Sequence, residues 1–166
     1  MLILGLDPGY ARAGWGVICQ EKNKLTPIAF GCLETTAQMS HAERLKKLQD
    51  EIKKIITKYQ PDALAIEELF FFKNLKTALQ VAESRGVILA TAFDCRLPIY
   101  EYTPLQIKQA VTSYGRADKN QVQQMVKLIL NMKTIIQPDD AADAVAIAIT
   151  CAHTIGKNIK LCPKNA

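Results

Sequence analysis

The N-terminal segment Leu2-Ile-Leu-Gly-Leu-Asp-Pro-Gly9 is an apolar run that ends in an acid and a turn signal, and the expected architecture is built around it. The apolar part predicts a buried strand, and the Asp-Pro-Gly triplet predicts the turn that follows it. Two further stretches, Gly14–Gln20 and Leu25–Thr35, predict strands that form a meander with the first. Asp7 is therefore expected at the carboxyl end of the first strand.

Alternating helices and strands follow this meander. Ser40-His-Ala-Glu43 has the form of a capping box, and apolar residues then recur at helical spacing as far as Tyr59, before Pro61. The short apolar run Ala63–Ile66 predicts an interior strand parallel to the first. The remaining expected elements are a helix with an apolar stripe from Leu75 to Leu89, a strand from Pro98 to Thr103, a helix starting at Thr103-Pro104, a helix opened by Asp118 and Gln121, and a last helix from Pro138-Asp139 to about Gly156. This order predicts an α/β domain with a mixed sheet flanked by helices.

Length and composition favour one globular domain over residues 1–166, with a core of about 1–156 and a short basic tail over 157–166. Hydrophobic residues make up 49% of the chain and charged residues 22%, which is close to a globular average. Its longest apolar stretch, Ala141–Ala152, contains Asp143 and is too short for a membrane span. The N-terminus lacks the basic region of a secretory signal. We therefore expect a cytoplasmic protein with no membrane partner.

The cysteine and charge patterns further narrow the class of protein. The five scattered cysteines form no C-x-x-C pair, which favours reduced and mostly buried thiols over a disulfide framework or a zinc cluster. The formal net charge is +5, and the segment Pro104–Lys133 carries five basic residues against one acid. Such a cluster suits a surface that faces a polyanion, although a solvated helix face is the commoner meaning.

Four acids are candidates for a shared site. Asp7 and Glu67 each stand at the carboxyl end of a strand, where ligands collect in open α/β sheets. Asp140 and Asp143 are three residues apart on the last helix and so share a face. Two carboxylates on neighbouring strand ends repel each other unless they share a cation or a proton. An all-carboxylate set suits Mg²⁺ or Mn²⁺ rather than Zn²⁺.

Taken singly, these acids also have ordinary structural explanations. An Asp before Pro-Gly is a routine turn residue, and the acids Asp139 and Asp140 are common in a first helical turn. His41 and His153 fit a helix surface and a helix C-terminus better than a ligand set. Phosphate-binding loops and the H-E-x-x-H motif are absent.

Several strings, taken in order along nearly the whole chain, resemble the RuvC family of bacterial Holliday-junction resolvases. They are Ile3-Leu-Gly-Leu-Asp7-Pro-Gly9, Ala65-Ile-Glu67, Asn74 after Phe70-Phe-Phe72, Ser84-Arg-Gly86-Val, Gln106-Ile-Lys108-Gln, Asp118-Lys119-Asn-Gln-Val122 and Asp140-Ala-Ala-Asp143-Ala. The resemblance implies a ribonuclease-H-like fold and metal-dependent cleavage of four-way DNA junctions during recombination and repair. It further implies a homodimer that acts beside the junction-migration helicase complex of RuvA and RuvB.

The same resemblance assigns roles to single residues. Asp7, Glu67, Asp140 and Asp143 match the catalytic positions and are expected to hold Mg²⁺, two ions per site, with Mn²⁺ able to substitute. We expect Asp7 to bridge the ions, Glu67 and Asp143 each to serve chiefly one of them, and Asp140 to be a second ligand or to orient water. Asp139 can substitute for Asp140.

Basic and aromatic residues are the candidates for contact with DNA. Lys108, Lys119 and Arg116 are expected to bind phosphates. One of the three consecutive aromatics, Phe70 by the resemblance, is expected to stack on unpaired junction bases, although packing under the next helix is the alternative. Two other functions stay open at this point: an ATP-binding domain of the actin and sugar-kinase type, and a junction-binding scaffold without catalysis.

Overall fold

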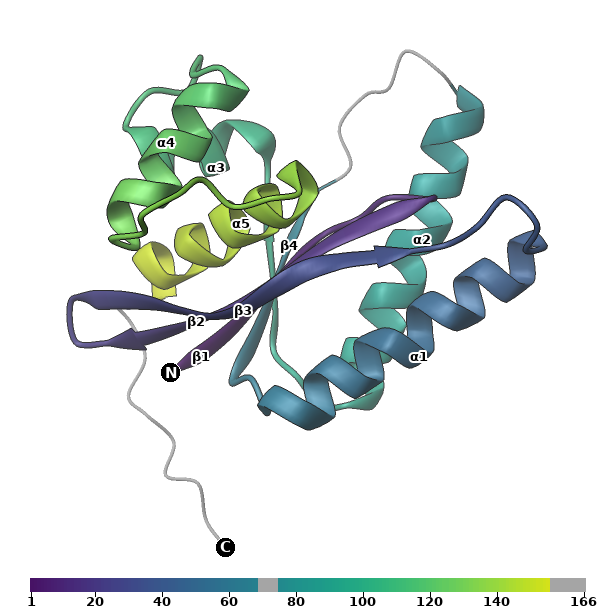
Figure 1. Ribbon diagram of the computed structural model, residues 1–166. Helices are drawn as coiled ribbons and strands as arrows, with labels where there is room; N and C mark the ends of the chain where they lie inside the picture. The colour runs from purple at the N-terminus through teal and green to yellow at the C-terminus, as the bar shows by residue number, and fades with distance from the viewer. Residues whose placement is uncertain (69–74, 156–166) are drawn as a thin grey trace, which may run out of the picture.

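A five-stranded sheet forms the centre of the computed structural model, which describes residues 1–68 and 75–155 (Figure 1). The strands are β1 (Leu2–Asp7), β2 (Arg12–Glu21), β3 (Lys24–Glu34), β4 (Ala63–Glu67) and β5 (Ile99–Tyr102). β1 to β3 form the antiparallel meander, and β4 pairs in parallel with β1 and β5 with β4. The spatial order β3-β2-β1-β4-β5 confirms the predicted mixed sheet.

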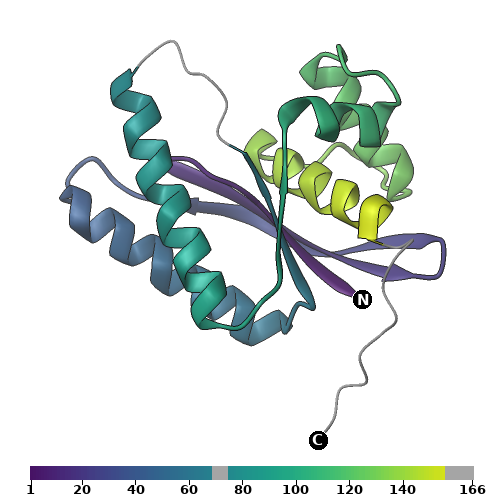
Figure 2. The same ribbon diagram turned by 180° about the vertical axis from the view of Figure 1, so that it is seen from behind.

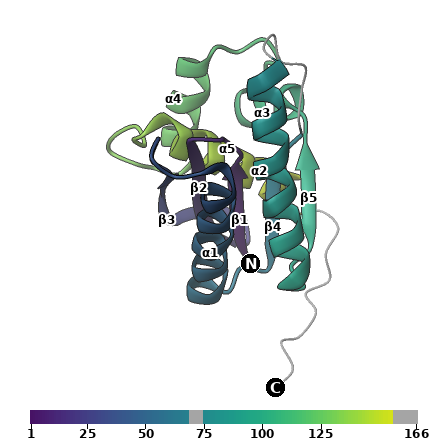
Figure 3. The same cartoon turned by 90° about the vertical axis from the view of Figure 1, so that its right-hand side faces the viewer.

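Helices cover both faces of this sheet. They are α1 (His41–Tyr59), α2 (Leu75–Asp94), α3 (Pro104–Thr112), α4 (Lys119–Ile129) and α5 (Asp139–Ile155). α1 and α2 lie side by side on one face, and α5 lies on the other with α3 and α4 beyond it, as Figures 1 and 2 show from opposite sides and Figure 3 from the side. Each helix predicted from the sequence is present, so these predictions are confirmed.

The alternation of side chains along β1 divides the core into two parts. Leu4 and Leu6 are fully buried against α1 and α2, whereas Ile3 is buried on the opposite face, among residues of α5. Because side chains alternate between the faces of a strand, Gly5 and Asp7 share the face of Ile3. The carboxyl end of β1 thus presents Asp7 on the side of the sheet that α5 covers.

Glycines let α5 approach the sheet closely. A Cβ atom at Gly5 would overlap the backbone oxygen of Ala144, and one at Gly14 would overlap the backbone oxygen of Asp140. The backbone of α5 therefore rests directly on β1 and β2, with no side-chain layer between them at these two points. This contact fixes the start of α5 beside the end of β1.

Capping boxes fix where α3 and α4 begin. The Asp118 side chain accepts a hydrogen bond from the backbone of Gln121 (2.8 Å), and the Gln121 side chain accepts one from the backbone of Asp118 (2.9 Å). Thr103 and Gln106 form the same arrangement at the start of α3. The reciprocal pair satisfies two backbone groups that a helix start otherwise leaves without partners. Lys119 is consequently held as the first residue of α4.

The remaining predictions about residue types concern cysteine, histidine and membranes. The four cysteines within the described ranges are free thiols, but the prediction that they are mostly buried is wrong: Cys151 is buried, Cys19 and Cys32 are half-buried, and Cys95 is exposed. His41 and His153 are exposed residues of the first turn of α1 and the last turn of α5, as predicted. Among residues 1–68 and 75–155, no helix combines the length and the apolar composition that crossing a bilayer requires.

Candidate active site

Three of the predicted acids converge on one cleft. β1 and β4 are parallel neighbours with Leu6 opposite Ile66, so Asp7 and Glu67, the next residues, end the two strands together. Asp143 reaches the same point from α5. The cleft has a volume of about 220 Å³ and is lined by Asp7, Glu67, Pro104, Ile107, Lys108, Lys119, Val122, Asp143, Ala146 and Ile147. Five of these lining residues are apolar, and the charged groups are three carboxylates and two lysines.

The pKa of Asp7 is the most strongly displaced among the carboxyl groups of the cleft. Burial, followed by the charges of Glu67, Asp143 and Asp140, raises the pKa of Asp7 from 3.8 to about 8, and only Lys119 opposes this. Removal from water disfavours the charged form of an acid, and nearby negative charges disfavour it further. Asp7 therefore lies where a cation would relieve both effects.

The pKa values of Glu67 and Asp143 are displaced in the same direction as that of Asp7. Burial, and then the charge of Asp143, raises the pKa of Glu67, while Lys108 lowers it in part. Burial also raises the pKa of Asp143, although Lys119 opposes this through a hydrogen bond and its charge. Strongly displaced pKa values cluster at functional sites, so these acids mark the cleft as a candidate active site.

Lys119 joins α4 to α5 through two acids. Its Nζ lies 2.7 Å from Asp139 Oδ2 and 2.9 Å from Asp143 Oδ2. Partial burial alone would lower the pKa of Lys119, but the hydrogen bonds to the two acids outweigh it and raise that pKa. The pKa of Asp139 is correspondingly lowered by its bond to Lys119. Sequence reasoning placed Lys119 against DNA and did not foresee this pairing.

Asp140 does not line the cleft. Its Oδ2 lies 3.4 Å from Nη1 of Arg12, and Nη2 of the same guanidinium lies 3.0 Å from Oε1 of Glu34. Asp140 nevertheless lies close enough to Asp7 to raise the pKa of Asp7. The structure thus brings Asp7, Glu67 and Asp143 together, and places Asp140 beside them with an arginine as its partner.

Two arginines support the site and were not singled out from the sequence. Arg12 holds Asp140, as described. Arg85, on α2, donates from Nε to the backbone oxygen of Glu67 (3.2 Å) and forms an ion pair with Glu101 of β5. The one signal in the sequence is that Arg85 belongs to Ser84-Arg-Gly86-Val, one of the strings that resemble the RuvC family. Nothing in its immediate sequence shows that it reaches the end of β4.

The predicted DNA-binding residues fall into three groups. Lys108 and Lys119 lie at the cleft. Arg116 is exposed on the connection between α3 and α4 and does not line the cleft. Phe70 lies outside the described residues, as do Phe71, Phe72 and Asn74. Its expected role therefore stays a prediction.

The donor types in the cleft fit a hard divalent cation. Carboxylate oxygens are the ligands that Mg²⁺ prefers. Burial and neighbouring negative charges raise the pKa values of the three carboxyl groups, and the two lysines offset this only in part. Within residues 1–68 and 75–155, however, no three His, Cys, Asp or Glu side chains form an arrangement that could hold a metal ion. Asp143 directs an oxygen to Lys119 instead. A cation held by Asp7, Glu67 and Asp143 would therefore compete with Lys119 for the Asp143 carboxylate.

Thermal stability without divalent cations should fall as pH rises from about 5.5 to about 8. Because the pKa of Asp7 is raised from 3.8 to about 8, the folded state keeps a proton over this range that the unfolded state has lost. Asp7→Asn should remove much of this dependence, and Mg²⁺ should raise the melting temperature more at pH 8 than at pH 5.5. Differential scanning calorimetry in EDTA and in Mg²⁺ measures the pH dependence and the effect of the cation on the melting temperature. If the melting temperatures of wild type and Asp7→Asn change with pH in the same way, the expectation is wrong.

Comparisons with known proteins agree with this architecture. The family model "Crossover junction endodeoxyribonuclease RuvC" matches residues 3–151. A protein of that name from Desulfitobacterium hafniense is 52% identical over 155 residues, which cover 93% of this chain and 94% of the relative.

Two solved structures from Thermus thermophilus are similar over nearly the whole chain. The RuvC structure has a TM-score of 0.88 and 33% identity, covering 95% of this chain and 96% of that chain. RuvC from the same organism, in complex with a Holliday junction substrate, has a TM-score of 0.87 and 31% identity, covering 95% and 97%. Because the family model and the relative both span almost all of the described sheet and helices, the chain belongs to the RuvC family of crossover junction endodeoxyribonucleases.

Proposed function

We propose that this chain is a structure-selective endonuclease that resolves four-way DNA (Holliday) junctions during recombination and repair. The observation that carries the proposal is the convergence of Asp7, Glu67 and Asp143 on a cleft flanked by Lys108 and Lys119. Acids from two strand ends and a helix can together serve one phosphodiester, and the lysines can bind the phosphates on either side of it.

We further propose Asp7, Glu67 and Asp143 as the residues that hold Mg²⁺, two ions per site with Mn²⁺ able to substitute. The bound cations would stabilise the charge that develops on the entering and leaving oxygens of the phosphodiester. Asp7 stands between Glu67 on β4 and the start of α5, which suits a residue shared by both ions. Asp140, held by Arg12, is proposed to orient the attacking water or to complete the coordination.

Cutting two strands of one junction requires two such clefts, and we propose a homodimer. The exposed face of α2 suits this contact, because Leu79, Gly86 and Phe93 recur every seven residues along it. Leu79 and Phe93 are 65% and 78% exposed as whole residues, and a Cβ at Gly86 would meet nothing within 4 Å. A twofold axis across this stripe would bring identical apolar faces together. Sedimentation of the chain in solution measures its oligomeric state.

Further partners and contacts follow from family membership and from charge. We propose action beside the RuvA and RuvB helicase complex in the cytoplasm.

Arg116 is proposed to bind phosphates next to the cleft, since it is exposed on the connection that leads to Lys119. Phe70 is proposed to stack on a base at the junction, and comparing Phe70→Ala on junctions with paired and with unpaired central bases would test this.

One experiment decides among the candidate functions. A synthetic four-way junction with Mg²⁺ should yield paired nicks near the crossover, whereas a linear duplex of the same sequence should stay largely intact. An ATP hydrolysis assay of the same preparation should give no activity above background. ATP hydrolysis without nicking would favour the actin and sugar-kinase type, and binding without nicking would favour a non-catalytic scaffold.

Lys108→Ala and Lys119→Ala should each weaken binding to any DNA and reduce the salt dependence. Each phosphate contact releases about 0.9 counterion on duplex DNA, so the slope of log affinity against log salt should flatten by about one per lysine. Fluorescence anisotropy at several salt concentrations, in EDTA, measures this slope.

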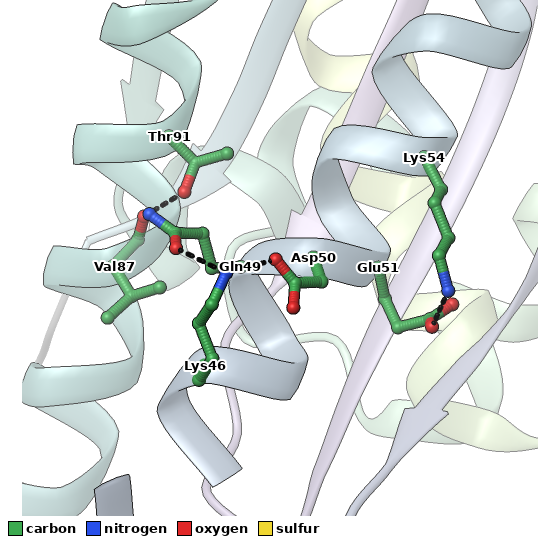
Figure 4. A network of polar contacts seen from close by, with 7 residues as sticks. All are labelled: Lys46, Gln49, Asp50, Glu51, Lys54, Val87 and Thr91. Atoms are coloured by element: carbon green, nitrogen blue, oxygen red, sulfur yellow. Dashed lines mark hydrogen bonds and ion pairs between the residues drawn. The ribbon is translucent and has the colours of Figure 1, made fainter. Parts of the chain in front are cut away.

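Lys54→Ala is the matched control for this measurement. Lys54 pairs with Glu51 on the outer surface of α1, on the face of the sheet opposite the cleft (Figure 4). The substitution removes the same charge as the two cleft variants, yet it should leave the slope unchanged. Equal slopes for wild type, Lys108→Ala and Lys119→Ala would mean that the cleft lysines do not contact phosphates.

A further inference from the structure

The ammonium group of Lys119 lies between two acids that differ in their relation to the cleft. Asp143 lines the cleft with Asp7 and Glu67, whereas Asp139, one turn earlier on α5, does not. The Asp139 side chain is 50% exposed, against 31% for Asp143. One partner of Lys119 thus belongs to the proposed cation site, and the other stands at its rim.

The backbone of Lys119 is fixed while its head group has room to move. The Asp118–Gln121 capping box holds Lys119 as the first residue of α4. Its side chain is 52% exposed, and the flexible stem of a lysine carries a compact charge that can change partners. Asp139 and Asp143 are four residues apart on one helix face, within reach of a single ammonium group.

A cation bound by Asp143 would compete with Lys119 for this carboxylate, because Asp143 Oδ2 lies 2.9 Å from the ammonium group. If Asp143 were the one acid near Lys119, the ammonium group would compete directly with the cation for its oxygens. Asp139 offers a second acceptor at 2.7 Å, slightly closer than Asp143 at 2.9 Å. Lys119 can therefore keep an ion pair at the cleft rim after Asp143 has turned away.

We propose that Asp139 is a positioning residue, which holds the Lys119 ammonium at the rim of the cleft and thereby frees Asp143 to bind the cation. The inference rests on the proposed function, because it takes Asp143 as a ligand. It gives Asp139 a role that acts through Lys119 and distinguishes Asp139 from the neighbouring Asp140, which is paired with Arg12.

A double-mutant cycle tests the proposal on the DNA-free protein, with Mn²⁺ binding measured by electron paramagnetic resonance. Asp139→Asn should weaken Mn²⁺ binding about two- to fivefold, the range of a partly exposed ion pair. In a Lys119→Gln background the same substitution should change it by less than about 1.5-fold, because the competing ammonium group is gone. Asp139→Glu should keep wild-type affinity, since it still accepts from Lys119.

Controls separate this role from a general effect of charge. Asp50→Asn removes an acid that pairs with Lys46 on the α1 surface and should leave Mn²⁺ binding unchanged (Figure 4). Equal weakening by Asp139→Asn in both backgrounds would make Asp139 a ligand or a long-range charge and overturn the proposal. Absence of both Mn²⁺ binding and junction nicking in the wild type would instead overturn the proposed function beneath it.

Discussion

Asp7→Asn should reduce cleavage of a four-way junction by about 10³-fold or more while leaving junction binding within about threefold of wild type. Removing a group that stabilises transition-state charge typically costs 10²–10³-fold, and Asp7 is proposed to serve two cations at once. DNA affinity comes mainly from phosphate neutralisation by basic residues, which this substitution does not touch. Single-turnover nicking in Mg²⁺ and anisotropy in Ca²⁺ measure the two quantities separately.

Two controls make this result interpretable. Asp50→Asn has the same chemistry on the surface of α1 and should cleave at the wild-type rate. The melting temperature of Asp7→Asn at pH 8 should equal or exceed that of the wild type, because the substitution removes a buried charge that Glu67 and Asp143 repel. Cleavage within tenfold of wild type would remove Asp7 from the site.

Gly5→Ala should destabilise the protein by about 3 kcal/mol or more and impair cleavage. The added Cβ would overlap the backbone oxygen of Ala144, so α5 must move away from β1. Overpacking of a close contact typically costs 1–3 kcal/mol, and a clash with backbone has less room to relax than one with a side chain. Because α5 carries Asp143, its displacement should also separate the acids of the cleft. Chemical denaturation and the nicking assay measure these effects.

Gly31→Ala is the matched substitution in the same sheet. Its Cβ would approach atoms of the Trp15 side chain at 3.1–3.4 Å rather than a backbone atom. A side chain can shift by a few tenths of an ångström, so this variant should lose less than about 1 kcal/mol and keep its nicking rate. Equal destabilisation by the two variants would mean that the contact between α5 and β1 is not the reason for glycine at position 5.

The placement of Asp7 and Glu67 could be predicted because it depends on neighbours along the chain. An apolar run followed by Asp-Pro-Gly predicts a strand and its end, and a short apolar run after a helix predicts a parallel interior strand. Strands that run in parallel end at the same edge of the sheet. The starts of α3 and α4 were equally predictable, since their capping boxes use residues three apart.

Asp143 was predictable only in part. Its helix followed from the apolar run after it, and its role followed from resemblance to the family. That it faces Asp7 depends on the depth at which α5 docks, which Gly5 and Gly14 permit. A glycine in a strand pattern has several possible meanings, and the helix that it accommodates lies far away in the sequence.

Short-range patterns of apolar residues, turns and caps specify the order and ends of the elements and the strand-end positions of Asp7 and Glu67, so these features could be predicted from the amino-acid sequence. The partners of the charged groups depend on the assembled fold: Lys119 lies between Asp139 and Asp143, Arg12 pairs with Asp140, and Arg85 donates to the backbone of Glu67. These contacts join different elements, and a charged side chain in a sequence carries no mark of its distant partner. Their geometry is fixed only once α5 rests on the sheet and α2 and α4 have packed into place.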